Sequence, residues 1–437
     1  MHHDLLSDFE SRGLVHQSTE PAAMRTWLAG TGRRVYAGFD PTADSLHVGH
    51  LVALVLLRRV ARAGHEPVAL VGGATGMIGD PSGRSEERNL LSPEDLAANV
   101  AGVERQIQAI LAADGLDSAS RRMHVVNNAD WMRGVGYLEF LRDVGKHVPL
   151  SQMLAKDSVK SRLERSDPES GLRGGLSYTE FSYMLLQAWD FVHLSDALDC
   201  RVQIGGSDQW GNITAGIELG RRLRGRELHG LTCPLLTKAD GTKMGKTASG
   251  AIWLDPRRTS PYRFYQYWIN LDDADAGRCL ERLTELPLDE VRGLDALRAA
   301  NPAARDTQRR LAESLTRLVH GEPGLAAAQQ ATAILFGAEI GGLDDASLAE
   351  IFADVPSREF ARTALDGEGL PLVEALEATG LAQSRGAARR TIEQGGAYVN
   401  NRRVADASYR LTPRDLAGAT SLVLRSGKKA YAVARFR

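Results

Sequence analysis

The chain has few cysteines, and they form no pattern. Only Cys200, Cys233 and Cys279 occur among 437 residues, an odd number without a Cys-x-x-Cys spacing. Such a set disfavours both a disulfide framework and a zinc site. Long apolar runs are also absent, since the longest, about residues 51–57, is far shorter than the roughly 20 residues that a membrane helix needs. The first residues, MHHD, contain no apolar signal core, so we expect a cytoplasmic protein.

The sequence also lacks a strong overall charge, but its charges are unevenly distributed. The net charge is -2, yet residues 380–437 contain twelve Lys and Arg against three Asp and Glu, which leaves 41 against 52 for the rest. A basic terminal segment on an otherwise acidic chain favours a polyanionic partner, although it can also be only a solvated face. The length predicts two or three domains, and the composition is that of an ordinary globular protein.

Strand and helix signals alternate between residues 30 and 250. Short apolar strands are expected at residues 34–38, 68–71, 124–127 and 201–204. Helices are expected between them, among them residues 48–63 and 179–194. This alternation predicts an α/β fold with a Rossmann-like, doubly wound parallel sheet, in which ligands bind beyond the carboxyl ends of the strands.

The rest of the chain predicts further domains. The Rossmann-like domain is expected at residues 1–255, with a helical insertion at about 130–170 that is a possible dimer interface. Residues 256–350 are rich in Ala, Leu and Arg and predict a helical domain, and 351–364 a linker. Residues 365–437 predict a small α+β module with two short helices and a hairpin that turns at Asn400-Asn401.

Two short motifs far apart in the chain suggest phosphate binding. His47 and His50 lie three residues apart at a helix start, where free N–H groups and the helix dipole favour an anion. Lys243, Lys246 and Thr247 lie on a glycine-rich loop that predicts a cationic phosphate clamp. Taken alone, the first motif can be a helix cap and the second a solvated turn.

Two glycine-rich loops each carry a carboxylate. Asp80 ends the segment GGATGMIGD, where it can face a cationic group such as an ammonium or simply form an Asx-turn before a proline. Asp208 follows a strand and opens a helix, where it can hold ribose hydroxyls or act as an N-cap.

A polar stripe runs along the expected helix at residues 179–194. Tyr183, Gln187 and Asp190 are spaced i, i+4 and i+7, while most other positions are apolar. Because a helix that is apolar nearly all round is buried, this stripe must be hydrogen-bonded. It is either a structural network or the wall of a pocket for a small polar ligand.

As a set, these residues resemble the bacterial tyrosyl-tRNA synthetases, from about Tyr36 to Asn270. The resemblance rests on FDPTADSLHVGH, GGATGMIGDPSGR, FSYMLLQAWDF, QIGGSDQWGNITAG and KMGKT. It implies a class I synthetase in which HVGH and KMGKT stand for the HIGH and KMSKS signatures, with Gly245 in place of the more general Ser. The basic C-terminal module resembles the S4-type RNA-binding domain.

The resemblance implies roles for individual residues. Catalysis would involve His47, His50, Lys243, Lys246 and Thr247. Tyrosine would be bound by Tyr36, Asp80, Tyr183, Gln187, Asp190 and Gln209, with Tyr36 and Asp190 at its phenol. ATP would be bound by Gly38, Asp40, Thr42, His47, Gly49, His50, Gly206, Asp208, Lys243 and Lys246. Arg84 and Arg88 would assist pyrophosphate, and RNA would be bound by Arg385, Arg389, Arg390, Arg402 and Arg403.

The activity implied is tyrosine–tRNA ligation in a homodimer. Tyrosine would be activated by ATP with Mg²⁺, with no metal bound by the protein itself, and then transferred to the 3′ end of tRNA(Tyr). Two alternatives stay open at this point. A tryptophan enzyme of the same class is disfavoured by Asp190 opposite Tyr36, because an indole offers one N–H. A non-enzymatic RNA-binding relative is disfavoured by the intact ATP motifs.

Overall fold

We describe the chain from a computed structural model, over residues 4–82, 91–116, 122–156, 159–160, 176–247, 250–353, 355–427 and 430–437. The expected pyrophosphate residues, Arg84 and Arg88, lie outside these ranges. By packing, the chain divides into two compact units, Met1–Glu322 and Pro323–Arg437. The finer domain boundaries expected from the sequence stay a prediction. Within the described residues, no helix is long and apolar enough to cross a membrane.

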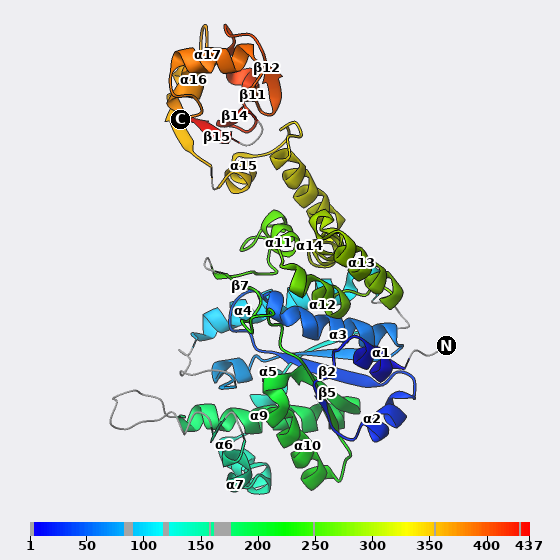
Figure 1. The fold of residues 1–437 in the computed structure, drawn as a ribbon. Helices are drawn as coiled ribbons and strands as arrows, with labels where there is room; N and C mark the ends of the chain where they lie inside the picture. Colours follow the sequence, from blue (N-terminus) through cyan, green and yellow to red (C-terminus); the bar gives the residue numbers. More distant parts are fainter. Residues whose placement is uncertain are drawn as a thin grey trace, which may run out of the picture. The chain divides into compact units, whose positions relative to one another are not determined.

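The first unit is built on a six-stranded sheet with the order β1-β6-β5-β2-β3-β4 (Figure 1). All neighbouring strands are parallel except β1, which runs antiparallel to β6 at one edge. The bounds of the strands are β1 Gln17–Ser18, β2 Arg34–Phe39, β3 Glu66–Val71, β4 His124–Asn127, β5 Cys200–Gly206 and β6 His229–Cys233. The four strands expected from the sequence and their parallel arrangement are confirmed.

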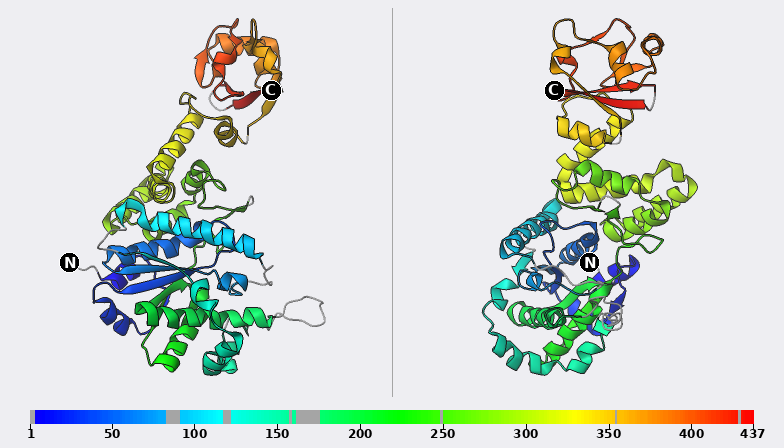
Figure 2. Two further views of the ribbon diagram at one scale, coloured as in Figure 1. Left: turned by 180° about the vertical axis from the view of Figure 1, so that it is seen from behind. Right: turned by 90° about the vertical axis from the view of Figure 1, so that its left-hand side faces the viewer.

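Helices cover both faces of this sheet (Figures 1 and 2). On one face lie α3 (Leu51–Arg62) and α4 (Pro93–Ala112), and on the other lie α9 (Tyr178–Leu198) and α10 (Trp210–Arg224). The helix expected at residues 48–63 begins as a 3₁₀ turn over Val48–His50 before α3. The doubly wound architecture is therefore present, and it brings the loops after β2, β3 and β5 to one edge of the sheet.

The other elements of the first unit surround this core. Before the sheet come α1 (Leu5–Ser11) and α2 (Pro21–Leu28). The expected insertion contains α5 (Ala129–Met132), α6 (Tyr137–Asp143) and α7 (Leu150–Leu154), and its residues 157–158 and 161–170 lie outside the described residues. A small hairpin, β7 (Lys246–Thr247) and β8 (Gly250–Ala251), precedes α11 (Pro261–Ile269), α12 (Asp273–Leu283) and α13 (Leu288–Ala300).

A long helix, α14 (Asp306–Leu335), is interrupted where the two units join. Gly321 has φ 70° and ψ −179°, and Pro323 follows two residues later. Glycine adopts this conformation without a side-chain clash, and proline cannot donate a hydrogen bond to the preceding turn. Both parts of α14, on either side of the interruption, lie within residues 256–350, for which the sequence predicts helices.

The second unit has a five-stranded sheet with the order β12-β11-β14-β15-β9. Its strands are β9 (Ser357–Phe360), β11 (Ala397–Val399), β12 (Arg402–Val404), β14 (Ser421–Ser426) and β15 (Ala430–Phe436), and β10 (Leu370–Pro371) pairs with β13 (Arg410–Leu411). The helices are α15 (Asp345–Ile351), α16 (Leu372–Ala378) and α17 (Arg385–Glu393). Residues 357–360, which the sequence assigned to a linker, form the edge strand β9 beside β15; their polar sequence has no strand-like alternation.

The expected hairpin turn is present and also anchors the second unit internally. Asn400 and Asn401 have φ values of 49° and 64°, the left-handed region that a tight hairpin turn requires. The amide of Asn401 donates to the carbonyls of Ile334 and Ala338 at the end of α14, at 2.9 and 2.7 Å. The turn therefore caps a helix C-terminus as well as joining two strands.

Candidate active site

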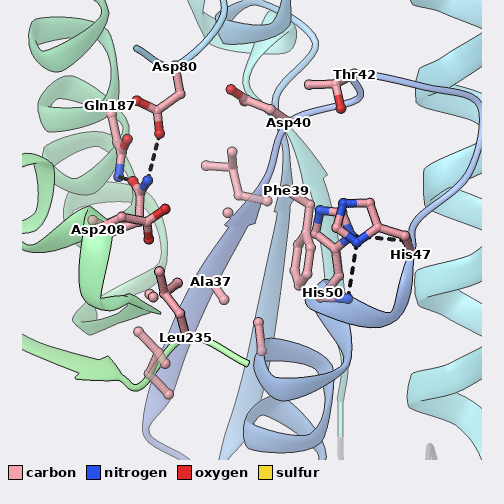
Figure 3. A pocket seen from close by; sticks show the side chains of 18 of the residues that line it. Ala37, Phe39, Asp40, Thr42, His47, His50, Asp80, Gln187, Asp208 and Leu235 are labelled. Carbon is pink, nitrogen blue, oxygen red and sulfur yellow. Dashed lines mark hydrogen bonds between the residues drawn. The ribbon is translucent and has the colours of Figure 1, made fainter. Parts of the chain in front are cut away.

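A cavity of about 700 Å³ lies at the carboxyl ends of the parallel strands. Figure 3 shows His47 and His50 on one side of the end of β2, and Asp80, Gln187 and Asp208 on the other, with Asp40 between them. The cavity is lined by His47, His50 and Lys243, from the two motifs predicted to bind phosphate, and by the polar stripe of α9, which lie far apart in the sequence. Its volume is in the range of small-molecule sites.

One end of the cavity is formed by two buried polar side chains, Tyr36 and Asp190. The Tyr36 hydroxyl, on β2, is buried and has no hydrogen-bond partner among the residues that the structure describes. Asp190, on α9, is also buried, and its carboxylate accepts hydrogen bonds from Asn128 Nδ2 at 3.0 Å and from Trp131 Nε1 at 2.9 Å. Burial raises the pKa of Asp190 to about 7, although both hydrogen bonds act in the opposite direction. A phenol would find both an acceptor and a donor here.

A chain of amides leads to a second carboxylate. Gln187 Nε2 donates to Gln209 Oε1 at 3.2 Å, and Gln209 Nε2 donates to Asp80 Oδ2 at 2.6 Å. The other oxygen of Asp80 accepts from the Ser82 N–H at 2.8 Å, which is the Asx-turn considered from the sequence. The Asx-turn and the polar network are therefore both present, and both face the cavity.

Tyr183, which is expected at tyrosine, is hydrogen-bonded within the protein to Asp40. Its hydroxyl donates to Asp40 Oδ2 at 2.8 Å, and Thr75 Oγ1 donates to Asp40 Oδ1 at 2.8 Å. Burial, followed by the charge of Asp40, raises the pKa of Tyr183 well above its usual value. The hydroxyl group thus connects the stripe on α9 with the residue expected at ATP.

The two histidines are held as hydrogen-bond donors toward the cavity. The Gly49 N–H donates to His47 Nδ1 at 3.0 Å, and the His47 N–H donates to His50 Nδ1 at 3.1 Å. Because each Nδ1 accepts, the ring proton of a neutral imidazole must sit on Nε2. Burial, with the nearby His47 as a smaller cause, lowers the pKa of His50 to about 3, so His50 is neutral at physiological pH.

Backbone hydrogen bonds through Ile252 connect the KMGKT motif to the HVGH motif. The Ile252 N–H donates to Gly245 O at 2.8 Å, and the Val48 N–H donates to Ile252 O at 3.0 Å. Gly245 has φ 79°, and a Cβ there would lie 3.0 Å from Val48 Cβ. A side chain at this position would therefore be strained by the backbone conformation and would need Val48 to shift by a few tenths of an ångström. The exposed Lys243 lines the cavity.

Fifteen of the seventeen residues expected to bind tyrosine or ATP or to take part in catalysis line this cavity. They are Tyr36, Gly38, Asp40, Thr42, His47, Gly49, His50, Asp80, Tyr183, Gln187, Asp190, Gly206, Asp208, Gln209 and Lys243. Lys246 and Thr247 lie in β7, where only the backbone is described. The structure therefore assembles the set, while the role of each member stays a prediction.

The sequence analysis missed three residues that lie next to Tyr36 or Asp190. Asn128 and Trp131 donate hydrogen bonds to the carboxylate of Asp190. Gln203 lines the cavity on β5, directly opposite Tyr36 on β2. Gln203 Oε1 is buried without a partner. The only available signal was that Asn128 follows a strand end and that Gln203 is a polar residue inside an apolar strand.

The expected RNA-binding arginines lie on two elements of the second unit. Arg385, Arg389 and Arg390 are exposed on α17, and Arg402 and Arg403 are exposed on β12. Two of them have acidic partners. Arg385 pairs with Glu374 and Glu377 at 3.3 and 3.2 Å, and Arg402 pairs with Glu339.

The fold and the cavity define a class of protein. Residues 30–337 match the family model of class I tRNA synthetases of the W and Y group. Because this match covers more than half of the chain, the chain belongs to that family. The α/β fold class expected from the sequence is confirmed.

Full-length relatives narrow the assignment to the tyrosine branch. Residues 347–434 match the SYY-like C-terminal domain of tyrosine–tRNA ligases. The chain is 56% identical to the tyrosine–tRNA ligase of Rhodopirellula baltica over 99% of its own length and 96% of that protein. It is 49% identical to that of Roseiflexus castenholzii, over 99% of each. These relatives confirm the predicted resemblance and the enzyme class, an aminoacyl-tRNA ligase.

A solved structure gives the same result. A C-terminally truncated mitochondrial tyrosyl-tRNA synthetase from Aspergillus nidulans aligns with a TM-score of 0.68 and 31% identity. The alignment covers 76% of this chain and 94% of that one.

Proposed function

We propose that the cavity binds L-tyrosine and ATP, forms tyrosyl-adenylate and pyrophosphate, and then transfers tyrosine to the 3′ end of tRNA(Tyr). The observation that carries this proposal is the buried, unpartnered Tyr36 hydroxyl beside the hydrogen-bonded carboxylate of Asp190. An unpaired buried hydroxyl costs about 1–3 kcal/mol, which a substrate phenol would recover. The proposal assigns the ammonium to Asp80, Gln187 and Tyr183, and the reacting carboxylate to the vicinity of Gln209.

In the first step, a tyrosine carboxylate oxygen attacks the α-phosphorus of ATP and pyrophosphate leaves. The reaction needs no base on the enzyme, so catalysis consists of positioning and charge stabilisation. His47 and His50 serve this step as Nε2–H donors to phosphate oxygens, consistent with their accepting Nδ1 atoms. Lys243 and Lys246 supply positive charge, and Asp208 and Thr42 bind other parts of ATP.

We propose that Mg²⁺ enters with the triphosphate. Within the described residues, no group of three or more His, Cys, Asp or Glu side chains is arranged to hold a metal ion. Mg²⁺ is commonly held by substrate phosphates and water with few protein ligands, which fits this donor set. When bound, it would neutralise charge on the leaving pyrophosphate.

The proposal includes binding of tRNA by the second unit. Arg389 and Arg390 are exposed on α17 near Arg385. Exposed arginines on one small domain favour phosphate contacts.

The cytoplasm, where tRNA is charged, is the location we expect.

We also propose that the protein is a homodimer through the insertion. Tyr137, Leu138 and Leu141 on α6, together with Leu150 and Leu154 on α7, are exposed apolar side chains. Clusters of this kind are rare on the surface of monomers and mark interaction sites. Sedimentation of the full chain, with Leu138→Asp as the variant, tests this part of the proposal.

The activity is tested by ATP–pyrophosphate exchange with tyrosine, phenylalanine and tryptophan supplied separately, without tRNA. We expect exchange with tyrosine alone. Exchange with tryptophan would overturn the assignment of Tyr36 and Asp190 to the phenol of the substrate. No exchange with any of the three would instead favour a non-enzymatic RNA-binding protein.

A further inference from the structure

We propose that Tyr267 is a positioning residue for the signature loop at residues 243–247, an inference that rests on the proposed function. Tyr267 lies on α11 and does not line the cavity. Its hydroxyl oxygen accepts a hydrogen bond of 2.9 Å from the Gly245 N–H. A side chain outside the cavity thus holds the backbone at the centre of the loop that carries Lys243 and Lys246.

Gly245 is the point where such a contact has most effect on the site. Its N–H is bound by Tyr267, and its carbonyl accepts from Ile252, which in turn accepts from the Val48 N–H. The backbone of Gly245 also lies against Val48 of the HVGH motif, where a Cβ would come within 3.0 Å. A continuous set of hydrogen bonds therefore runs from α11 through the KMGKT loop to the helix start that carries the histidines.

Tyr267 itself is well fixed. Its ring makes an edge contact with Trp268, at 4.9 Å between centroids and 78° between planes, and Trp268 is fully buried. The helix that carries both residues is capped by Ser260, whose side chain accepts from the Arg263 N–H. A fixed hydroxyl at this position restrains a loop that contains one glycine with positive φ, Gly245, and is flanked by two more, Gly241 and Gly250.

A neighbouring contact fixes the residue before Gly245. The Met244 N–H donates to Leu236 O at 2.9 Å, and its buried sulfur accepts from Cys279 Sγ at 3.6 Å. The side chain of Met244 is thus inserted among the helices that follow the sheet, while Tyr267 holds the next peptide group. Loss of the hydroxyl would leave Met244 in place and remove one of the two hydrogen bonds that hold the backbone of Gly245, directly before Lys246.

This arrangement predicts an effect on ATP and not on tyrosine. Gly245 lies beside Val48 and Gly49, at the histidine side of the cavity, whereas tyrosine is assigned to the end formed by Tyr36 and Asp190. One neutral hydrogen bond contributes modestly, so we expect the Tyr267→Phe protein to lose about three- to tenfold in kcat/KM for ATP. The KM for tyrosine should stay within twofold.

The experiment compares the full-length wild type, Tyr267→Phe and Tyr265→Phe in ATP–pyrophosphate exchange, varying ATP and tyrosine in turn. Tyr265 is a matched control, because it is a buried tyrosine on the same helix, two positions away and therefore on a different face. Its phenol has a raised pKa because of burial and the charge of Glu313, with Arg309 acting in the opposite direction. The Tyr265→Phe variant should leave kcat/KM for ATP and KM for tyrosine unchanged. Tyrosine binding and the thermal midpoint are measured in parallel.

Several outcomes would overturn the inference. These are unchanged ATP constants in Tyr267→Phe, an equal loss for tyrosine and ATP, or the same loss in Tyr265→Phe. A Tyr267→Phe protein that fails to fold would also contradict it, because the hydroxyl would then support the fold and not the loop. A wild type that shows no exchange with tyrosine would instead refute the proposed function, so the two failures are distinguishable.

Discussion

Replacing Tyr36 by Phe should stabilise the protein and weaken tyrosine recognition at the same time. The Tyr36 ring packs edge-on against Phe191, at 5.2 Å between centroids, and Phe would keep this contact. Only the hydroxyl is lost, which is buried without a partner. Residues that serve the ligand and not the fold are expected to show these opposite signs.

The magnitudes follow from the hydrogen-bond inventory. A buried hydroxyl without a partner costs about 1–3 kcal/mol in the ligand-free protein, so its removal should raise the free energy of unfolding by about 1 kcal/mol after allowing for a small cavity. In the complex the same hydroxyl would pair with the substrate phenol, a contact worth about 0.5–1.5 kcal/mol. We therefore expect kcat/KM for tyrosine to fall about two- to tenfold.

Phenylalanine as substrate is the internal control. It has no hydroxyl to pair with Tyr36, so its kcat/KM should not fall in the variant, and the preference for tyrosine should shrink by the factor lost on tyrosine. Pyrophosphate exchange gives kcat/KM for tyrosine and for phenylalanine, and urea unfolding gives the free energy of unfolding. Marked destabilisation, or an equal loss for phenylalanine, would refute the reasoning, since the hydroxyl would then have a structural partner.

Three other perturbations test different parts of the site. Because burial raises the pKa of Asp190 to about 7, its carboxylate becomes protonated as the pH falls below 7, so KM for tyrosine should rise between pH 8 and 6, and an Asp190→Asn variant should lack this dependence. The raised pKa also means that the contribution of Asp190 to stability is present at low pH and is lost as the pH rises through about 7. Gly245→Ser should lower kcat for exchange at least tenfold with little change in tyrosine binding, since serine is strained at φ 79° and its Cβ would press on Val48; unchanged kcat would contradict this account. Deleting residues 323–437 should abolish tRNA charging while pyrophosphate exchange continues, and loss of both would show that the second unit supports the first.

Much of the fold could be predicted because its signals are local. The parallel strands are short apolar segments bounded by Gly-rich loops, and α9 combines an apolar surface with one polar stripe. Since parallel strands place their carboxyl ends at one edge, residues as distant as Asp40, Asp80 and Asp208 could be expected to meet. The cavity lining agrees with that expectation.

Partners that depend on tertiary contacts could not be predicted in this way. Asn128 and Trp131 follow β4, and nothing in their own segment indicates that both donate to a carboxylate on α9. Likewise, Tyr183 belongs to the expected stripe, but its bond to Asp40 depends on how closely α9 approaches the end of β2. Side-chain pairing across elements is fixed by their packing and not by sequence spacing.

The two ends of the cavity differ in how they are built, and this difference has a functional reason. Tyr36 and Gln203 lie inside adjacent strands and Asp190 lies inside a long helix, so the phenol end is carried by regular elements. Discrimination between tyrosine and phenylalanine depends on one hydroxyl group, and rigid elements place its partners most accurately. The end at which we propose that ATP binds and pyrophosphate leaves is carried by a 3₁₀ turn and a small hairpin. Substitution of Tyr267, which holds the loop before that hairpin, should therefore alter the ATP-dependent step alone. Substitution of Asn128 or Trp131, which donate to Asp190, should alter the choice of amino acid.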